Sequence, residues 1–218
     1  MRKKIVIRPL IREKFQEFLQ GQRILFFSAP CGFGKSTVAE VLLSGRSVLR
    51  RSGEEENPIP EEGDWNILLV DDFQRMPEEN VLALCQYIRS TPDRRFVFLS
   101  RGVPPGCMMA FQYAGIMGVI SAQEMLFDEE DIQTLFRLYD VPVTRSEVSG
   151  ILKESIGYAL GVAITVRLMA SGRPFGPELV KDAFQEVYRY FEAAIFMPLD
   201  LTIRRFLLEL APFETYLY

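Results

Sequence analysis

The first 120 residues alternate short apolar runs with segments whose apolar residues recur at helical spacing. The apolar runs are bounded by polar or turn residues, which is typical of buried strands. We predict strands at Arg23 to Ser28, Ser47 to Arg50, Ile67 to Val70, Phe96 to Ser100 and Gly118 to Ile120. Helices are expected at Ser36 to Leu43 and at Pro77 to Ser90. Strands that alternate with helices predict an α/β fold with a parallel sheet covered on both faces.

After about Ser121 the pattern becomes purely helical. Asp128 can cap a helix that runs to Tyr139, and Thr144 with Glu147 forms a capping box for the next one. Further helices are expected at Ala159 to Ala170 and at Glu178 to Phe196. The pattern therefore predicts an α/β core at residues 1–121 and a helical subdomain at residues 122–197.

Residues 198–218 begin a new amphipathic helix and end on several aromatic residues. We interpret them as the start of a further, truncated module. Residues 51–66 are rich in acids, proline and glycine and have no apolar period, so we expect a solvated connecting loop.

The composition limits the possible chemistry. The chain has 218 residues, 48% of them hydrophobic, a net charge of -4, three cysteines and no histidine. The absence of histidine excludes Ser/His/Asp and Cys/His nucleophiles, and the mild negative charge gives no global field for nucleic acid or anionic membranes. No apolar stretch reaches the ~18 residues of a membrane span, and the three cysteines form no disulfide framework. We expect a cytoplasmic protein without a membrane partner.

The turn between the first strand and the first helix has the features of a phosphate-binding loop. It reads Ser-Ala-Pro-Cys-Gly-Phe-Gly-Lys-Ser-Thr, close to the motif GxxxxGK[ST], with alanine at the first glycine position. Two glycines permit the tight backbone, the amides and the helix N-terminus attract phosphate, and the lysine reaches the outer phosphates. The predicted nucleotide-binding residues are Ala29, Pro30, Cys31, Gly32, Phe33, Gly34, Lys35, Ser36 and Thr37. Ser36 is also a predicted Mg²⁺ ligand.

Two later strands end in polar residues that suit the same site. Asp71 and Asp72 follow the buried strand that starts at Ile67, at the edge where ligands of parallel sheets gather. We expect Asp71 to bind Mg²⁺ with Ser36, and Asp72 to orient or activate the attacking water. Arg101 follows the strand at Phe96 to Ser100 and is predicted to sense the γ phosphate. Asp72 and Arg101 are thus the candidate catalytic residues.

Four segments together resemble the nucleotide-binding domain of MalT-like LuxR-family transcriptional regulators, which belong to the STAND class of signalling ATPases. They are SAPCGFGKST, LLVDDFQRM, FVFLSRGVPP and ESIGYALGVAI. The resemblance implies a P-loop NTPase fold of the additional-strand type, in which the strand at Phe96 to Ser100 lies between the other two. It also implies a helical lid in which Gly157 and Tyr158 touch adenine, with Ala159 in place of the family's proline. Residues 198–218 then resemble the start of a winged-helix module.

The chain also departs from this family. Gly34 and Asp71 are only 37 positions apart (71 − 34), which indicates the loss of a helix and leaves open the loss of a strand. The segment after Pro105 lacks the family's arginines. These departures bear on hydrolysis more than on binding.

The resulting functional hypothesis is a switch domain of a transcriptional regulator. We expect it to bind ATP and ADP with Mg²⁺, to hydrolyse ATP slowly, and to change lid position and self-association with nucleotide state. DNA would be bound only by a downstream domain absent from these residues. A scaffold that binds nucleotide without hydrolysis, and a small-molecule kinase, remain alternatives.

Overall fold

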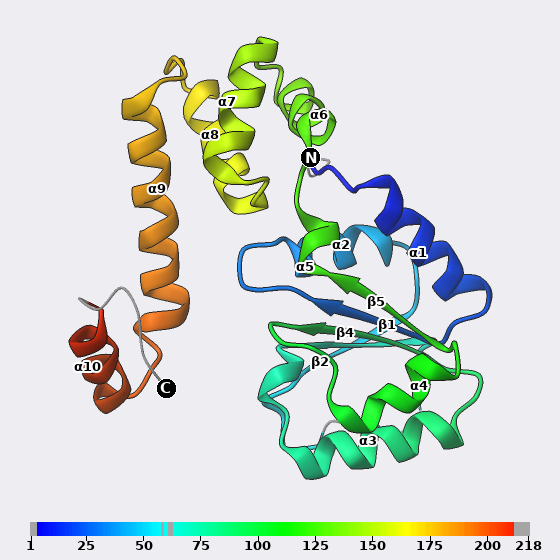
Figure 1. The fold of residues 1–218 in the computed structure, drawn as a ribbon. Helices are drawn as coiled ribbons and strands as arrows, with labels where there is room; N and C mark the ends of the chain where they lie inside the picture. Colours follow the sequence, from blue (N-terminus) through cyan, green and yellow to red (C-terminus); the bar gives the residue numbers. More distant parts are fainter. Residues whose placement is uncertain (1–3, 58, 61–62, 212–218) are drawn as a thin grey trace.

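The computed structural model describes residues 4–57, 59–60 and 63–211, which form an α/β core, a group of helices and a helical arm (Figure 1). The core contains a five-stranded sheet in the order β2-β3-β4-β1-β5, and all neighbouring strands are parallel. The strands are β1 (Ile24–Ser28), β2 (Val48–Ser52), β3 (Ile67–Asp71), β4 (Arg95–Ser100) and β5 (Met117–Ser121). This confirms the predicted α/β sheet and the position of β4 between β1 and β3.

Alternation along each central strand creates two cores. In β1, Leu25 and Phe27 point to one face, where they pack with α1 (Pro9–Gln20) and α2 (Lys35–Leu42). Ile24 and Phe26 point to the other face, which α3 (Glu78–Ser90) and α4 (Met109–Tyr113) cover (Figure 1). Successive strand side chains point to opposite faces, so a strand buried on both sides must be apolar throughout. Burial on both faces of the sheet therefore explains the apolar runs in the sequence.

The helices beyond β5 pack around a core of their own. They are α5 (Ala122–Met125), α6 (Glu129–Tyr139), α7 (Arg145–Ser155) and α8 (Ala159–Ala170). The predicted caps are present: Asp128 accepts backbone hydrogen bonds at the start of α6, and Thr144 forms a capping box with Glu147. Buried residues including Ile132, Phe136 and Val162 form this core. The division at residue 121 stays a prediction, although β5 ends there.

A long arm follows these helices. It consists of α9 (Pro177–Phe191), a π-helical turn (Glu192–Phe196) and α10 (Leu201–Leu210). α9 packs along α8, whereas α10 stands apart from the core at the far end of the arm (Figure 1). No described side chain of α10 is buried. The last aromatic residues of the predicted further module, within residues 212–218, lie outside the described residues.

One expectation about the chain before β3 needs correction. The connection from residue 51 to 66 is not solvated throughout, because β2 continues to Ser52 and the Trp65 side chain is only 6% exposed, packed into the core beneath the sheet. β2 is the strand predicted at Ser47 to Arg50, and it ends two residues later than predicted. Among the described residues between β2 and β3 there is no helix, which agrees with the predicted loss of one.

Three helical segments were not predicted from the sequence: α1, α4 and α5. α1 begins at Pro9, which suits the first helical turn because it needs no N–H donor there. The short 3₁₀ turns at Phe73–Arg75 and Gly106–Met108 follow β3 and β4.

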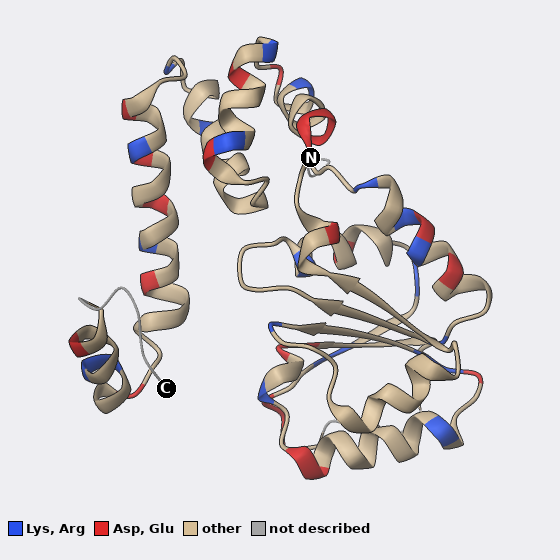
Figure 2. Ribbon diagram, in the orientation of Figure 1, with Lys and Arg blue, Asp and Glu red and all other residues tan. Residues whose placement is uncertain are grey.

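Acidic and basic residues are spread along most of the described elements (Figure 2). Both signs of charge occur along α9. Among the described residues, no helix is both long and apolar enough to cross a bilayer.

Candidate nucleotide site

The loop between β1 and α2 has the backbone of a phosphate cradle. Gly32 and Gly34 have φ values of 81° and 84°, in the left-handed region that favours glycine. Gly34 is the N-cap of α2, so the free amides of the first helical turn face the space beyond the loop. Local geometry therefore explains the two glycines of the motif. Two residues in the left-handed conformation bend the chain around the helix N-terminus, which attracts anions.

Lys35 lies inside this loop. Its ammonium donates hydrogen bonds to the carbonyl oxygens of Ala29 at 2.7 Å and Pro30 at 3.0 Å. Burial lowers the pKa of Lys35, and the nearby Cys31 and Asp71 act in the opposite direction. The carbonyls of the loop thus hold a buried cation directly behind the amides, which adds to the positive potential of the cradle.

Ser36 and Asp71, the two predicted metal ligands, are brought together. The Ser36 hydroxyl donates a hydrogen bond of 2.9 Å to Oδ2 of Asp71. Oδ1 of Asp71 accepts from the Asp72 amide at 2.8 Å, which fixes the carboxylate plane. A hydroxyl and a carboxylate are oxygen ligands of the kind that Mg²⁺ prefers, with water and phosphate completing its shell. The described residues contain no cluster of three or more His, Cys, Asp or Glu side chains that would favour another metal.

Asp72 and Arg101, the candidate catalytic residues, contact each other. Nε of Arg101 lies 3.4 Å from Oδ1 of Asp72. Gln74, which the sequence analysis missed, donates to the same oxygen at 2.7 Å and accepts a hydrogen bond from the Arg101 amide at 2.9 Å. Asp72 itself has a left-handed φ of 48°. The side chains at the ends of β3 and β4 are therefore joined into one small network at the sheet edge.

A cavity of about 550 Å³ opens over the loop. Its polar end is lined by residues 31–37 of the loop together with Asp71, Asp72 and Arg101. The rest of its lining is mostly apolar, apart from Lys4 and Arg8, and comes from the N-terminal segment and from the helices and turns after β5. The apolar residues include Ile5, Val6, Phe127, Leu135, Tyr139, Ala159 and Leu160. One end thus suits a polyphosphate, and the other suits a flat, weakly polar ring.

The N-terminal segment is a part of the site that sequence reasoning missed. Arg8 lines the cavity and crosses to the helices after β5, where it donates to the Glu124 carbonyl at 3.1 Å and to Asp128 at 2.9 Å. It also forms an ion pair of 2.8 Å with the buried Asp131. The signal in the sequence was the apolar run Ile5-Val6-Ile7 before Arg8-Pro9, since such a run is expected to pack against something.

Gly157 and Tyr158 lie behind the loop and do not line the cavity. The Tyr158 hydroxyl donates to the Cys31 carbonyl at 3.0 Å, and its ring packs edge-on against Phe33 at 5.2 Å. Gly157 has a φ of 75°, and any side chain there would overlap the Phe127 backbone. The next residues of α8, Ala159 and Leu160, line the cavity in their place. The predicted contact with adenine stays a prediction for Gly157 and Tyr158.

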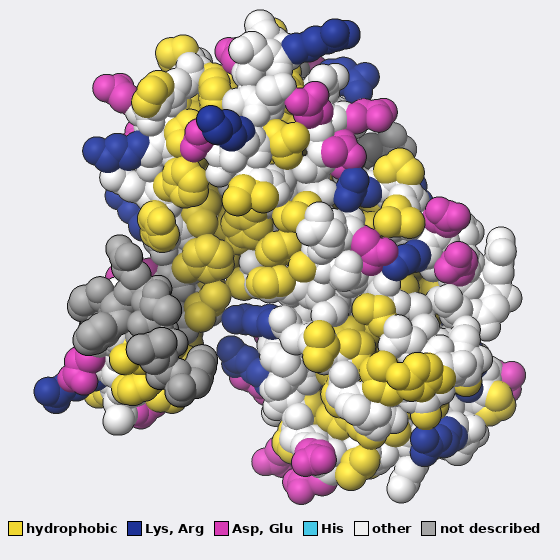
Figure 3. Space-filling view, in the orientation of Figure 1, with side chains coloured by type: hydrophobic (Ala, Val, Ile, Leu, Met, Phe, Trp, Pro, Cys, Tyr) yellow, Lys and Arg dark blue, Asp and Glu magenta, His cyan; other side chains and the backbone are white. Residues whose placement is uncertain are grey.

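The arm also reaches the loop. The Tyr190 hydroxyl of α9 lies 3.2 Å from the Cys31 sulfur, and the Phe191 ring stacks on Tyr158 at 6.2 Å. The hydrogen bond to Cys31 and partial burial raise the pKa of Tyr190 to about 12. Hydrophobic side chains gather on the surface between the arm and the core (Figure 3). The phosphate loop is therefore in contact with both α8 and α9.

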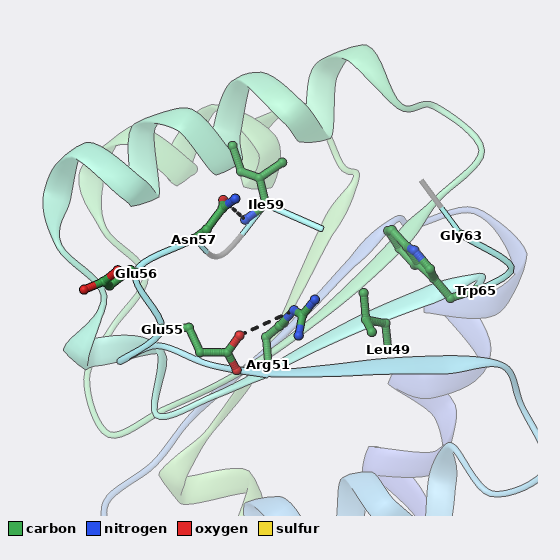
Figure 4. Close-up of a pocket in the computed structure, with 8 residues that line it drawn as sticks. All are labelled: Leu49, Arg51, Glu55, Glu56, Asn57, Ile59, Gly63 and Trp65. Atoms are coloured by element: carbon green, nitrogen blue, oxygen red, sulfur yellow. Dashed lines mark hydrogen bonds and ion pairs between the residues drawn. The ribbon is translucent and has the colours of Figure 1, made fainter. Parts of the chain in front are cut away.

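A second cavity lies beside β2 and holds none of the predicted site residues. Arg51, in an ion pair with Glu55, faces it from the strand, and Leu49 and Trp65 line one end (Figure 4). Trp65 is also covered by the Arg94 guanidinium, 4.4 Å from its ring. This cavity has no phosphate-binding backbone.

No protein-family model matches the sequence, and no curated protein is significantly similar to it. Solved structures do match. A Walker-type ATPase of Pyrococcus abyssi aligns with a TM-score of 0.61 at 13% identity, over 94% of this chain and 77% of that one. The Thermotoga maritima RuvB Holliday junction branch migration motor aligns with a TM-score of 0.54 at 15% identity, over 94% and 76%.

A Signal Transduction ATPase with Numerous Domains (STAND) protein with a tetratricopeptide repeat sensor, from Pyrococcus horikoshii, aligns with a TM-score of 0.58 at 15% identity. The alignment covers 97% of this chain but only 35% of that protein. At these identities the similarity establishes the fold alone. The chain has the α/β fold of P-loop NTPases.

Proposed function

We propose that this chain is a nucleotide-dependent signalling switch domain that binds ATP and ADP with Mg²⁺ and hydrolyses ATP slowly. The observation that carries the proposal is the 2.9 Å hydrogen bond between Ser36 and Asp71 at the mouth of the phosphate loop. A hydroxyl on one element and a carboxylate on another meet where a P-loop protein needs its metal. The resemblance to MalT-like regulators extends the proposal to a role in transcription regulation.

The residues of the loop have the chemistry to hold the phosphates. The amides from Gly32 to Thr37 would donate to phosphate oxygens, and Lys35 would turn from the Ala29 and Pro30 carbonyls toward the outer phosphates. Ser36 and Asp71 would hold Mg²⁺, which would neutralise part of the phosphate charge. The apolar end of the cavity would take the base.

Slow turnover is consistent with the state of Asp72. Arg101 and Gln74 both contact Oδ1 of its carboxylate. This fixes the orientation in which Oδ2 can meet the attacking water, and a proton can go to Oδ1 only after these contacts are broken. The same observation favours a second candidate, a nucleotide-dependent scaffold that binds without hydrolysis. Arg101 is suited to both, because it would exchange Asp72 for a γ phosphate.

The contacts of the loop with α8 and α9 support the switch. Tyr158, Tyr190 and Phe191 join the loop to the lid and the arm, so a loop that closes on phosphate would also shift these helices. The proposed output is a change of lid and arm position, with self-association in the ATP state. DNA would be bound only through a domain downstream of these residues.

Hydrolysis is tested with a variant of the candidate catalytic carboxylate. ATP and ADP are titrated with Mg²⁺, and phosphate release is followed for the wild type and Asp72→Asn. We expect slow release that the variant lowers at least ~10-fold while binding is kept. Tight binding without release from the wild type would select the scaffold. Absence of binding would reject both candidates.

The arm contact is tested with Tyr190→Cys and a short bis-maleimide cross-linker, because the shorter side chain ends several ångström from Cys31, too far for a direct disulfide. We expect the cross-link between positions 31 and 190 to form in the free protein and to form more slowly with ATP and Mg²⁺ present. Tyr188→Cys, on an exposed position of the same helix, is the matched control. Equal rates of cross-linking with and without nucleotide would contradict the proposed movement.

A further inference from the structure

Two cysteines meet beneath the sheet, away from the nucleotide site. Cys85 lies in α3 and Cys107 lies in the 3₁₀ turn after β4, and their sulfur atoms are 4.0 Å apart. Cys85 is only 3% exposed, whereas Cys107 is half-buried. Both sulfurs pack at the edge of the apolar cluster beneath the sheet, which also holds Leu84, Ile88 and Met108.

The two thiols are chemically unequal. Burial and the neighbouring Cys107 raise the pKa of Cys85 to about 12, so its thiol stays protonated at neutral pH. Cys107 is the thiol that solvent can reach, and it is therefore the one that a small oxidant meets first. A disulfide has a sulfur separation of about 2.05 Å, so the sulfurs must approach by roughly 2 Å, which side-chain rotation can supply.

We propose that Cys85 and Cys107 form a reversible, oxidisable dithiol that a peroxide converts to a disulfide. In the first step Cys107 loses its thiol proton and the thiolate attacks a peroxide oxygen, which breaks the O–O bond and gives a sulfenic acid. With hydrogen peroxide the leaving hydroxide takes up that proton and is released as water. In the second step the Cys85 sulfur attacks the Cys107 sulfur, breaking the S–O bond. The Cys85 proton leaves with the hydroxide as a second water. A thiol reductant restores both cysteines.

The disulfide would close a loop that contains β4 and one residue of the nucleotide site. The two cysteines are 22 positions apart, and the segment between them includes β4 and Arg101. The segment from Arg101 to Cys107 would then be bonded to α3 through Cys107. Oxidation is expected to restrict this segment, which links the redox state to the residue that faces Asp72.

The third cysteine provides an internal control. Cys31 lies in the phosphate loop and contacts Tyr190, far along the chain from the pair and on another element. It has no second cysteine among the partners that the structure gives it. It should therefore remain alkylatable after reduction of any sulfenic acid by arsenite, which leaves disulfides intact.

The experiment treats the folded wild-type chain with hydrogen peroxide, then with arsenite, then unfolds it and alkylates it with N-ethylmaleimide. Peptide mass spectrometry should find Cys85 and Cys107 joined, with the loss of two hydrogen atoms, and Cys31 alkylated. In Cys85→Ser the Cys107 peptide should instead carry sulfinic acid or remain alkylatable. Separate alkylation of Cys85 and Cys107 in the oxidised wild type would overturn the proposal, and so would a bond from either one to Cys31.

A second measurement addresses the linked loop. Hydrogen exchange of the peptide spanning residues 100–108 is compared before and after oxidation, with the Cys107→Ser chain as the control. We expect slower exchange in the oxidised wild type alone, together with a rise in unfolding temperature of about 5–10 °C. An unchanged exchange rate and an unchanged unfolding temperature would show that the bond does not constrain the segment.

Discussion

The central strands and the end of the arm differ sharply in how their apolar residues are used. In β1, β3 and β4 the apolar side chains are almost fully buried between two layers of helices. In α10 none is buried, although its apolar residues recur at helical spacing. Its exposed apolar side chains include Leu201, Ile203, Phe206 and Leu208. The same kind of pattern therefore gives a packed element in one region and an uncovered face in the other.

This difference shows where conformational change costs least. The central strands β1, β3 and β4 have a strand on each side and apolar clusters on both faces, so separating them would expose a large apolar area. The arm is held along α8 and by a few contacts with the phosphate loop. Regions with few buried contacts open at lower free energy than the core. The arm and not the sheet is the part expected to respond to nucleotide.

The largest expected effect comes from a pair of phenylalanine substitutions. Phe98 in β4 is fully buried and packs against the rings of Phe73 at 4.8 Å and Phe26 at 6.2 Å. Phe98→Ala should lower the free energy of unfolding by about 3–5 kcal/mol, through lost transfer energy and a cavity. Phe206→Ala in α10, where the side chain is 57% exposed, should change it by less than ~0.5 kcal/mol. Urea unfolding measures both, and similar losses would contradict the contrast drawn between the regions.

The next effect concerns the phosphate loop, which follows β1 and contacts α9 of the arm. Lys35→Ala should weaken ATP binding at least ~100-fold, about 2.7 kcal/mol, because the loop loses its only cation. Lys153→Ala, on an exposed face of α7, should leave binding unchanged. Calorimetry or a fluorescent nucleotide measures the affinity, and circular dichroism checks the fold. Equal ATP affinity for wild type and Lys35→Ala would show that this loop does not bind the phosphates.

A smaller effect is expected where Arg8 connects the N-terminal segment to the helices after β5. Arg8→Ala removes the ion pairs with Asp128 and Asp131 and the hydrogen bond to the Glu124 carbonyl. It leaves the buried Asp131 carboxylate without its cation. We expect a loss of about 1–2 kcal/mol and faster hydrogen exchange at the start of α6. Arg12→Ala, on an exposed face of α1, is the matched control. Unchanged hydrogen exchange in α6 would show that Arg8 does not stabilise the start of this helix.

The smallest effect is a change in acid sensitivity within the core. Burial acts to raise the pKa of Glu124, but hydrogen bonds from Lys14 and Ser121 outweigh it and leave the pKa below its usual value. A carboxylate with a lowered pKa stabilises the fold above its unfolded-state pKa, and this contribution is lost as the pH falls through its folded-state pKa.

Lys14→Met should therefore cost about 0.5–1 kcal/mol at neutral pH and reduce the loss of stability between about pH 5 and pH 3. Lys4→Met removes a more exposed pair with Asp140 and should have a weaker effect. Thermal unfolding across this pH range compares the three chains. An identical pH dependence for wild type and Lys14→Met would contradict the role assigned to Glu124.

The parts of this protein that depend on neighbours in sequence were predictable from the sequence. The strands follow from apolar runs that both faces of a sheet require, and the caps at Asp128 and Thr144 depend only on residues three positions away. The phosphate loop is local too, because its glycines, lysine and serine are consecutive. The strands, the caps and the phosphate loop were therefore determined by the local sequence, whereas the order of the strands in the sheet was expected only from the resemblance to a known family.

What the sequence did not reveal depends on residues far apart along the chain. Arg8 meets Asp131, Tyr190 meets Cys31, and Cys85 meets Cys107, each pair brought together by packing and not by spacing. The shared hydrogen bonds of Asp72, Gln74 and Arg101 likewise needed β3 and β4 to be adjacent. Local propensity selects elements, but long-range apolar packing decides which side chains face each other. For this reason the tertiary structure alone decided how the cavity is closed and what the phosphate loop contacts.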